Sequence, residues 1–132
     1  MKDIIFDDFQ NSVSESLLRH KSILDIMTKL QESEARINRA IAKSVTNCGC
    51  IQIEAGRQKL PNDSIDNKNL QNYLETHIKG EMCENCREVL EKEIGNNFFY
   101  LFSLCNTLDL NLYDILLKEY NRINTLGKFS LK

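Results

Sequence analysis

The strongest constraint on the fold is one long stretch, residues 82–108, in which apolar side chains recur every three or four positions. An α-helix has 3.6 residues per turn, so this spacing predicts a helix with one continuous apolar face. The face consists of Cys83, Cys86, Leu90, Ile94, Phe98, Leu101 and Cys105, widened by Phe99, Phe102, Leu104 and Leu108. A helix apolar over so much of its circumference lies at the centre of a bundle or in a dimer interface.

The rest of the chain also favours helices, since one proline and five glycines leave few interruptions in 132 residues. Ser12 and Glu15 have the spacing of a capping box at a helix start. Apolar spacing then continues to residue 48, which predicts either two helices or one long helix over residues 14–58. A short helix is expected over residues 69–78. Asn111, with Asp114 three positions on, predicts the N-cap of a last helix.

Together these segments predict an all-α fold, a four- to five-helix bundle formed by one domain over residues 1–132. The region near residues 60–69 is the expected linker, because it contains the only proline and a turn-forming Pro61-Asn62-Asp63-Ser64 sequence. The short connection at 109–111 predicts that the last two helices are antiparallel neighbours. The apolar face of 82–108 exceeds what a small bundle covers, so we expect a homodimer.

Charge and hydropathy exclude several classes of protein. The formal net charge is −2, and basic residues are spread over both halves, which argues against nucleic acid as a partner. No apolar run approaches the roughly 20 residues of a membrane span. The first ten residues are acidic and lack a signal-peptide pattern. We therefore expect a cytoplasmic protein without a membrane partner, in which the five cysteines are thiols or metal ligands.

Acidic residues form two groups on the long helix. The first steps by three or four residues along one flank: Glu81, Glu84, Glu88 and Glu91. The second begins with Glu93 and Asn96 on the other flank of the apolar face. Like charges at such spacing repel one another, and a bound divalent cation would offset the repulsion. Solvated helix flanks are the alternative interpretation of both groups.

Four of the cysteines form two close pairs. Cys48 and Cys50 enclose one glycine, and Cys83 and Cys86 have the C-x-x-C spacing of zinc ligands. Two such pairs predict a tetrahedral zinc site, which is an alternative to a divalent-cation site at the acidic groups. The other interpretation is that these thiols are small apolar residues, since Cys83 and Cys86 also belong to the apolar helix face.

Residues 93–122 resemble the MazG-like, all-α nucleoside triphosphate pyrophosphatases. The matching positions are Glu93, Gly95, Asn96, the apolar run 98–104, the turn 109–111 and the final helix 112–122. The resemblance implies a magnesium-dependent nucleotide pyrophosphohydrolase. In that family an E-x-x-E motif on an earlier helix and an E-x-x-D motif on this helix hold the magnesium.

Only some of the acidic residues of that magnesium site have counterparts in this chain. Glu93 matches the first acid of E-x-x-D, whereas Asn96 stands at the aspartate position and offers only an uncharged carbonyl oxygen. In the earlier motif Glu32 remains, and Ser33 and Arg36 occupy the other acidic positions. Glu84, Glu88 and Glu91 are further candidates for the magnesium ligands. Fewer carboxylates weaken a site for a hard cation, so the fold can be shared while the activity is lost or altered.

The sequence thus leaves two functional hypotheses open. The first is a magnesium-dependent pyrophosphohydrolase with a nucleotide substrate, for which no catalytic residue is assigned. The second is a non-catalytic helical protein that acts by self-association or partner binding and has a structural zinc at Cys48, Cys50, Cys83 and Cys86.

Overall fold

The computed structural model describes residues 2–17, 21–59 and 72–126. In chain order the elements are helix α1 (Lys2–Ser16), helix α2 (Ile23–Lys43), the π-helical turn η1 (Ser44–Cys48), strands β1 (Ile51–Ile53) and β2 (Ile78–Gly80), helix α4 (Glu84–Thr107) and helix α5 (Leu112–Leu126). The predicted helical class is confirmed. The two strands were not predicted, and they pair antiparallel with Ile51 opposite Gly80.

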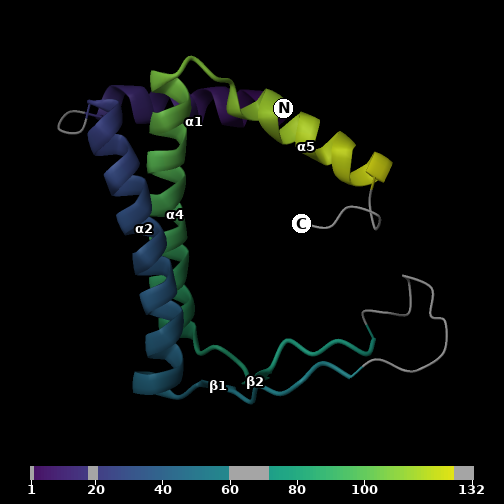
Figure 1. Ribbon diagram of the computed structural model, residues 1–132. Coiled ribbons are helices and arrows are strands. Elements are labelled where there is room, and N and C mark those ends of the chain that lie inside the picture. Colours follow the sequence, from purple (N-terminus) through teal and green to yellow (C-terminus); the bar gives the residue numbers. More distant parts are fainter. Residues whose placement is uncertain (1, 18–20, 60–71, 127–132) are drawn as a thin grey trace.

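The two longest helices, α2 and α4, run side by side in opposite directions and form a helical hairpin (Figure 1). The β1–β2 ribbon lies at the end where α2 finishes and α4 begins, and α1 and α5 lie at the other end. So α2 and α4 pack along their length, whereas α1 and α5 attach at one end of the pair. Within the described residues, no helix combines the length and apolar character that crossing a membrane requires.

The starts of α2 and α5 have local causes. Ser22 Oγ accepts from the Leu24 N–H at 3.3 Å, so α2 begins after a break and the alternative of one helix over 14–58 is wrong. Asn111 Oδ1 accepts from the Asp114 N–H at 3.0 Å, which confirms the predicted N-cap. Ser12, in contrast, lies inside α1 and does not begin a helix.

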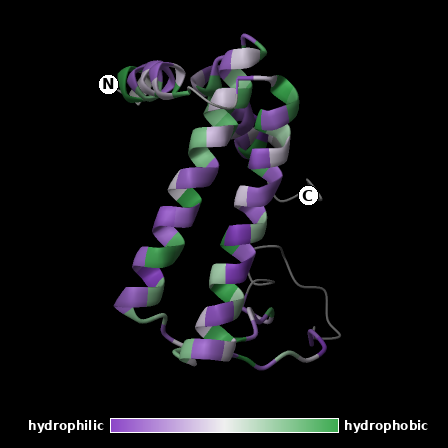
Figure 2. Cartoon of the chain, turned by 90° about the vertical axis from the view of Figure 1, so that its left-hand side faces the viewer, coloured by the Kyte–Doolittle hydropathy of each residue, from purple (hydrophilic) through white to green (hydrophobic). Residues whose placement is uncertain are grey.

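The core is small and lies mainly where α1 crosses the hairpin. Its buried apolar side chains there are Val13, Ile26, Phe102 and Cys105. Farther along the hairpin α2 and α4 also form polar contacts, as with the Asn97 amide that donates to Ser33 Oγ at 2.9 Å. Figure 2 shows hydrophilic and apolar residues alternating along both long helices. The end near the ribbon therefore depends on something other than a broad apolar core.

The last helix departs from its predicted position. Instead of returning along α4, α5 projects away from the hairpin and packs against α1 (Figure 1). The cause is Gln10 of α1, whose Nε2 donates to Asn106 Oδ1 at 2.8 Å and to the Leu110 carbonyl at 3.2 Å. These bonds hold the α4–α5 turn against α1, so the direction of α5 is set by a contact between residues about 100 positions apart.

Two further expectations concern the segment between the strands. The predicted linker near residues 60–69 lies outside the described residues. Of the short helix expected over 69–78, residues 72–77 are described and are not helical, and Ile78 already belongs to β2. That part of the prediction is wrong: residues 72–73 form a turn, His77 has a left-handed φ of +63°, and Ile78 pairs with Ile53 of β1.

Candidate metal centre

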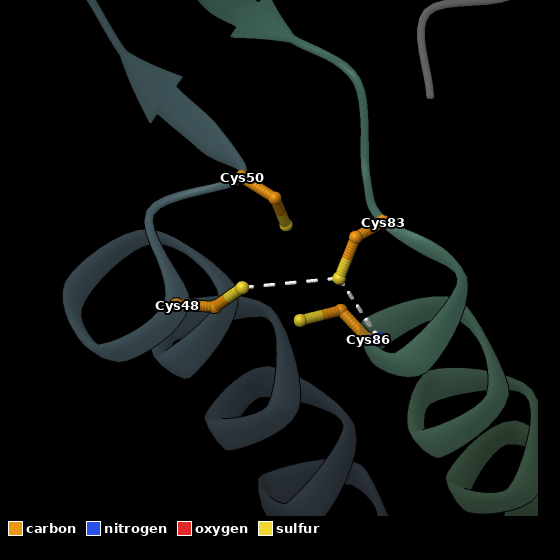
Figure 3. A group of neighbouring side chains, drawn as sticks. All are labelled: Cys48, Cys50, Cys83 and Cys86. Atoms are coloured by element: carbon orange, nitrogen blue, oxygen red, sulfur yellow. Dashed lines mark hydrogen bonds between the residues drawn. The ribbon is translucent and has the colours of Figure 1, made fainter.

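The four paired cysteines meet at the ribbon end of the helical hairpin. Cys48 ends η1 and Cys50 precedes β1, whereas Cys83 and Cys86 lie at the start of α4. Their Sγ atoms all lie within 4.8 Å of one another (Figure 3). The structure therefore brings together all four cysteines that sequence spacing proposed as zinc ligands, and we call them the cysteine cluster.

Two glycines make this convergence sterically feasible. Gly49 has φ of +78°, a left-handed conformation that turns the chain between Cys48 and Cys50. Gly80 has φ of +87°, and a Cβ placed there would lie 2.7 Å from the Cys50 carbonyl oxygen. Without a side chain at Gly80, β2 approaches β1 closely enough to bring Cys83 beside the first cysteine pair.

Hydrogen bonding at the start of α4 polarises the second pair. Cys83 is the N-cap, and its Sγ accepts from the Cys86 N–H at 3.4 Å. That backbone N–H, together with the Cys86 thiol, lowers the pKa of Cys83 to about 7. The interaction with Cys83, followed by desolvation, raises the pKa of Cys86 to about 12. The Cys83 thiol therefore ionises near neutral pH, whereas the Cys86 thiol keeps its proton there.

The sulfur spacing fits one tetrahedral metal ion. A tetrahedral ion with metal–sulfur bonds of about 2.3 Å sets its sulfur ligands about 3.8 Å apart. The Cys48 and Cys83 Sγ atoms are 3.8 Å apart. Thiolate sulfur is a soft ligand that selects ions such as zinc and iron, not magnesium. The cluster could hold a metal, and its donors suggest zinc rather than magnesium.

The carboxylate of Glu93, the main residue of the magnesium hypothesis, is held by a positive side chain. Arg36 Nε donates to Glu93 Oε2 at 2.7 Å, and the Glu93 side chain is only 15% exposed. This hydrogen bond and the charge of Glu93 raise the pKa of Arg36. The arginine of α2 thus faces Glu93 at the position where the resemblance would place a second acid.

Within the described part of the chain, the proposed magnesium ligands form no converging group of three or more carboxylates. Asn96 is exposed, and Glu32 pairs with Lys29 at 3.3 Å on its own helix. Three glutamates of the first acidic group lie exposed on α4: Glu84, Glu88 and Glu91. Among the described residues, the cysteine cluster is the one group of three or more thiol, imidazole or carboxylate ligands that converges.

The sequence did not reveal two contacts that connect α2 with α4. Asn97, not Asn96, faces α2 and donates to Ser33, and Arg36 pairs with Glu93. A signal for both existed in the helical spacing, because Ser33 and Arg36 lie three positions apart on α2, and Glu93 and Asn97 lie four apart on α4. Which residues face each other across two helices depends on their relative rotation, and spacing within one helix does not fix that rotation.

Comparisons of the chain with family models, with curated proteins and with solved structures find no match. The features described so far define a mostly helical chain that carries a four-cysteine cluster at one end of a helical hairpin.

Proposed function

We propose that this chain is a non-catalytic, self-associating helical protein whose hairpin is fastened by one structural zinc ion at Cys48, Cys50, Cys83 and Cys86. The observation that carries the proposal is the convergence of the four Sγ atoms to within 4.8 Å of one another. Four thiolates from two short motifs are a typical closed coordination shell for structural zinc, since they leave no position for substrate or water.

The position of the cluster explains what a zinc ion would do. It joins the last turn of η1 to the first turn of α4, at the ends of two helices that are separated by the whole β1–β2 segment. An ion that binds the folded state alone shifts the equilibrium towards that state, and so stabilises it. Near this end of the hairpin Ile51 is the one buried apolar side chain among the described residues, so zinc would supply cohesion that the core does not.

Elemental analysis of the purified chain tests the metal. We expect one zinc ion per chain, retained through gel filtration in metal-free buffer, and colourless protein. One iron per chain with a visible absorption band would keep the site but overturn zinc as its metal. Absence of any metal, together with failure of the reduced chain to take up added zinc, would contradict the proposal.

Self-association is the activity that the remaining surface supports. Many large apolar side chains at the α1–α5 end of the hairpin are exposed over about half of their surface or more, among them Ile5, Phe98 and Leu116. Contiguous apolar surface of that kind marks a site of protein–protein contact. The homodimer expected from the sequence therefore stays part of the proposal.

A magnesium-dependent nucleotide pyrophosphohydrolase is the second candidate. It is favoured by a groove of about 280 Å³ between α2 and α4, where Glu93 lies with three basic side chains, Arg36, Arg39 and Lys43. Three positive charges and one negative charge would attract a phosphate-bearing anion. This candidate ranks second because the Glu93 carboxylate, which would have to bind magnesium, is already bonded to Arg36.

Assays of pyrophosphate release from a panel of nucleoside triphosphates distinguish the two candidates. If the protein is non-catalytic and stabilised by zinc, it is expected to release no pyrophosphate above background, with or without magnesium. Release that requires magnesium, and that falls at least about 100-fold in Glu93→Gln but not in the control Glu91→Gln, would instead support the hydrolase. Glu91 is a suitable control because it is an exposed glutamate of the same helix.

A further inference from the structure

The cysteine cluster contains thiols from two segments that are far apart in the sequence. Cys48 ends η1 and Cys83 caps α4, and the two residues are 35 positions apart. All five cysteines of the chain lie within the described residues, and the fifth, Cys105, is buried elsewhere on α4. Each thiol of the cluster therefore has the other cluster thiols as its nearest partners for oxidation within the chain.

Cys48 and Cys83 are the pair best placed to form a disulfide. Their Sγ atoms lie 3.8 Å apart in hydrogen-bond contact, across the gap between the two long helices (Figure 3). A disulfide bond is about 2.05 Å long, so the two sulfurs must approach each other by less than about 2 Å. Rotation of the two side chains provides movements of that size without displacing either helix.

Exposure and hydrogen bonding separate Cys48 from the other thiols of the cluster. Cys48 is exposed, whereas Cys50, Cys83 and Cys86 are each partly buried. The Cys50 thiol donates to the Ser44 carbonyl oxygen at 3.8 Å, which directs its sulfur towards η1. A small oxidant from the solvent therefore reaches Cys48 first, and the sulfur in contact with Cys48 is that of Cys83.

We propose that the cysteine cluster is a redox switch, in which hydrogen peroxide joins Cys48 to Cys83 in a disulfide and thereby releases the zinc ion. This inference rests on the zinc site of the proposed function and adds the regulation of that site. Zinc binds thiolates, and a disulfide sulfur is no longer a thiolate. Cys50 and Cys86 then remain as two ligands, which is half of a closed tetrahedral shell.

The oxidation proceeds in two steps. The O–O bond of the peroxide breaks as the Cys48 sulfur bonds to one oxygen, which gives a sulfenic acid and releases the other oxygen as water. The Cys83 sulfur then attacks the Cys48 sulfur, so that an S–S bond forms, the S–O bond breaks and the second oxygen leaves as water. The two sulfurs lose the two electrons that the peroxide gains. Protons from the solvent complete both water molecules and protonate Cys50 and Cys86 as the zinc ion leaves.

The disulfide would join the same two parts of the chain as the zinc ion. It links the end of η1 to the start of α4, and it closes a loop between residues 35 positions apart. Closing a loop of that length restricts the unfolded chain and so favours the folded one. The hairpin therefore stays closed in both states, and the switch changes whether zinc is bound.

Treatment of the zinc-loaded full chain with stoichiometric hydrogen peroxide tests the switch. A colorimetric zinc indicator measures the released metal, and peptide mapping without reduction identifies the disulfide. We expect one zinc ion released for each Cys48–Cys83 disulfide formed, and recovery of both thiols and zinc binding after addition of dithiothreitol. Cys105→Ala is the matched control, because Cys105 lies outside the cluster, and it should give the same disulfide and the same zinc release.

The position of the disulfide and the zinc content separate this inference from the proposed function. A zinc-bound chain that keeps its thiols and its metal under peroxide overturns the switch alone. Predominant pairing of Cys83 with Cys86 also overturns it, because the oxidation would then follow proximity in the sequence and not the contact with Cys48. A chain that takes up no zinc, yet forms the Cys48–Cys83 disulfide, overturns the metal of the proposed function and retains the oxidation.

Discussion

Replacing Cys86 by serine should abolish stable zinc binding and remove the metal-dependent part of the protein's thermal stability. A ligand present at 1,000 times its dissociation constant stabilises the folded state by about 4 kcal/mol. For a chain of this length that free energy corresponds to about 12–20 °C in melting temperature. Addition of a strong chelator should therefore lower the melting temperature of the wild-type chain by that amount and leave Cys86→Ser unchanged.

The fifth cysteine provides the control for this experiment. Cys105 also lies on α4, but it is buried in the core and does not belong to the cysteine cluster. Cys105→Ala removes one thiol and loses some packing, yet it should retain zinc and the full response to the chelator. If Cys86→Ser binds zinc as tightly as the wild-type chain does, the cluster is not the metal site.

Protons compete with the metal ion for the cysteine sulfurs, and Cys86 shows how zinc binding should change with pH. Its pKa of about 12 means that the thiol keeps its proton in the metal-free protein at neutral pH. Zinc must displace that proton, because the metal binds the thiolate. Acid therefore favours the metal-free form, and the stabilisation by zinc is lost as the pH falls.

Replacing Gln10 by alanine should destabilise the attachment of α1 and α5 to the hairpin by roughly 1–3 kcal/mol, as the loss of part-buried hydrogen bonds predicts. The Gln10 side chain is almost fully buried and contacts three groups: Asn106 Oδ1, the Leu110 carbonyl and the Leu112 N–H. Alanine would leave these groups without their partner. The free energy of unfolding from urea titration, at fixed protein and zinc concentrations, measures the effect.

The adjacent residue supplies a matched control for Gln10. Asn11 lies on the same helix and is exposed, so Asn11→Ala should change the free energy of unfolding by no more than about 0.5 kcal/mol. Hydrogen exchange should also accelerate in α5 of Gln10→Ala but not of Asn11→Ala. Equal stability of the two variants would mean that Gln10 does not determine where α5 lies.

Helices α4 and α5 were predictable because their signals are local, whereas α1, which already begins at Lys2, was missed. The spacing of residues 82–108 predicted α4, which spans Glu84–Thr107, and the Asn111 cap predicted the start of α5. The strands β1 and β2 were missed because each has three residues, too few for an alternating pattern to stand out from the helical spacing around it. Their conformation comes from pairing with each other across the intervening segment.

The two proposed metal sites differed in how far the sequence could lead. Cys48, Cys50, Cys83 and Cys86 were all identified from spacing, since sulfur ligands of one ion cluster in short motifs. Their convergence additionally requires the left-handed Gly49 and the close approach at Gly80, which spacing alone does not reveal. For Glu93 the sequence supplied a resemblance to a magnesium ligand, and the structure supplied Arg36 as its neighbour.

The sequence by itself determined the features that depend on neighbouring residues. These are the helical class, the extent of α4, the cap of α5 and the identity of the four thiols. What only the tertiary structure decided is how these parts face one another. The pairing of Arg36 with Glu93, the closing of the cysteine cluster and the direction of α5 all join residues far apart in the chain. The physical reason is that periodicity fixes the faces of a helix, whereas contacts such as those of Gln10 fix the position of the helix in space.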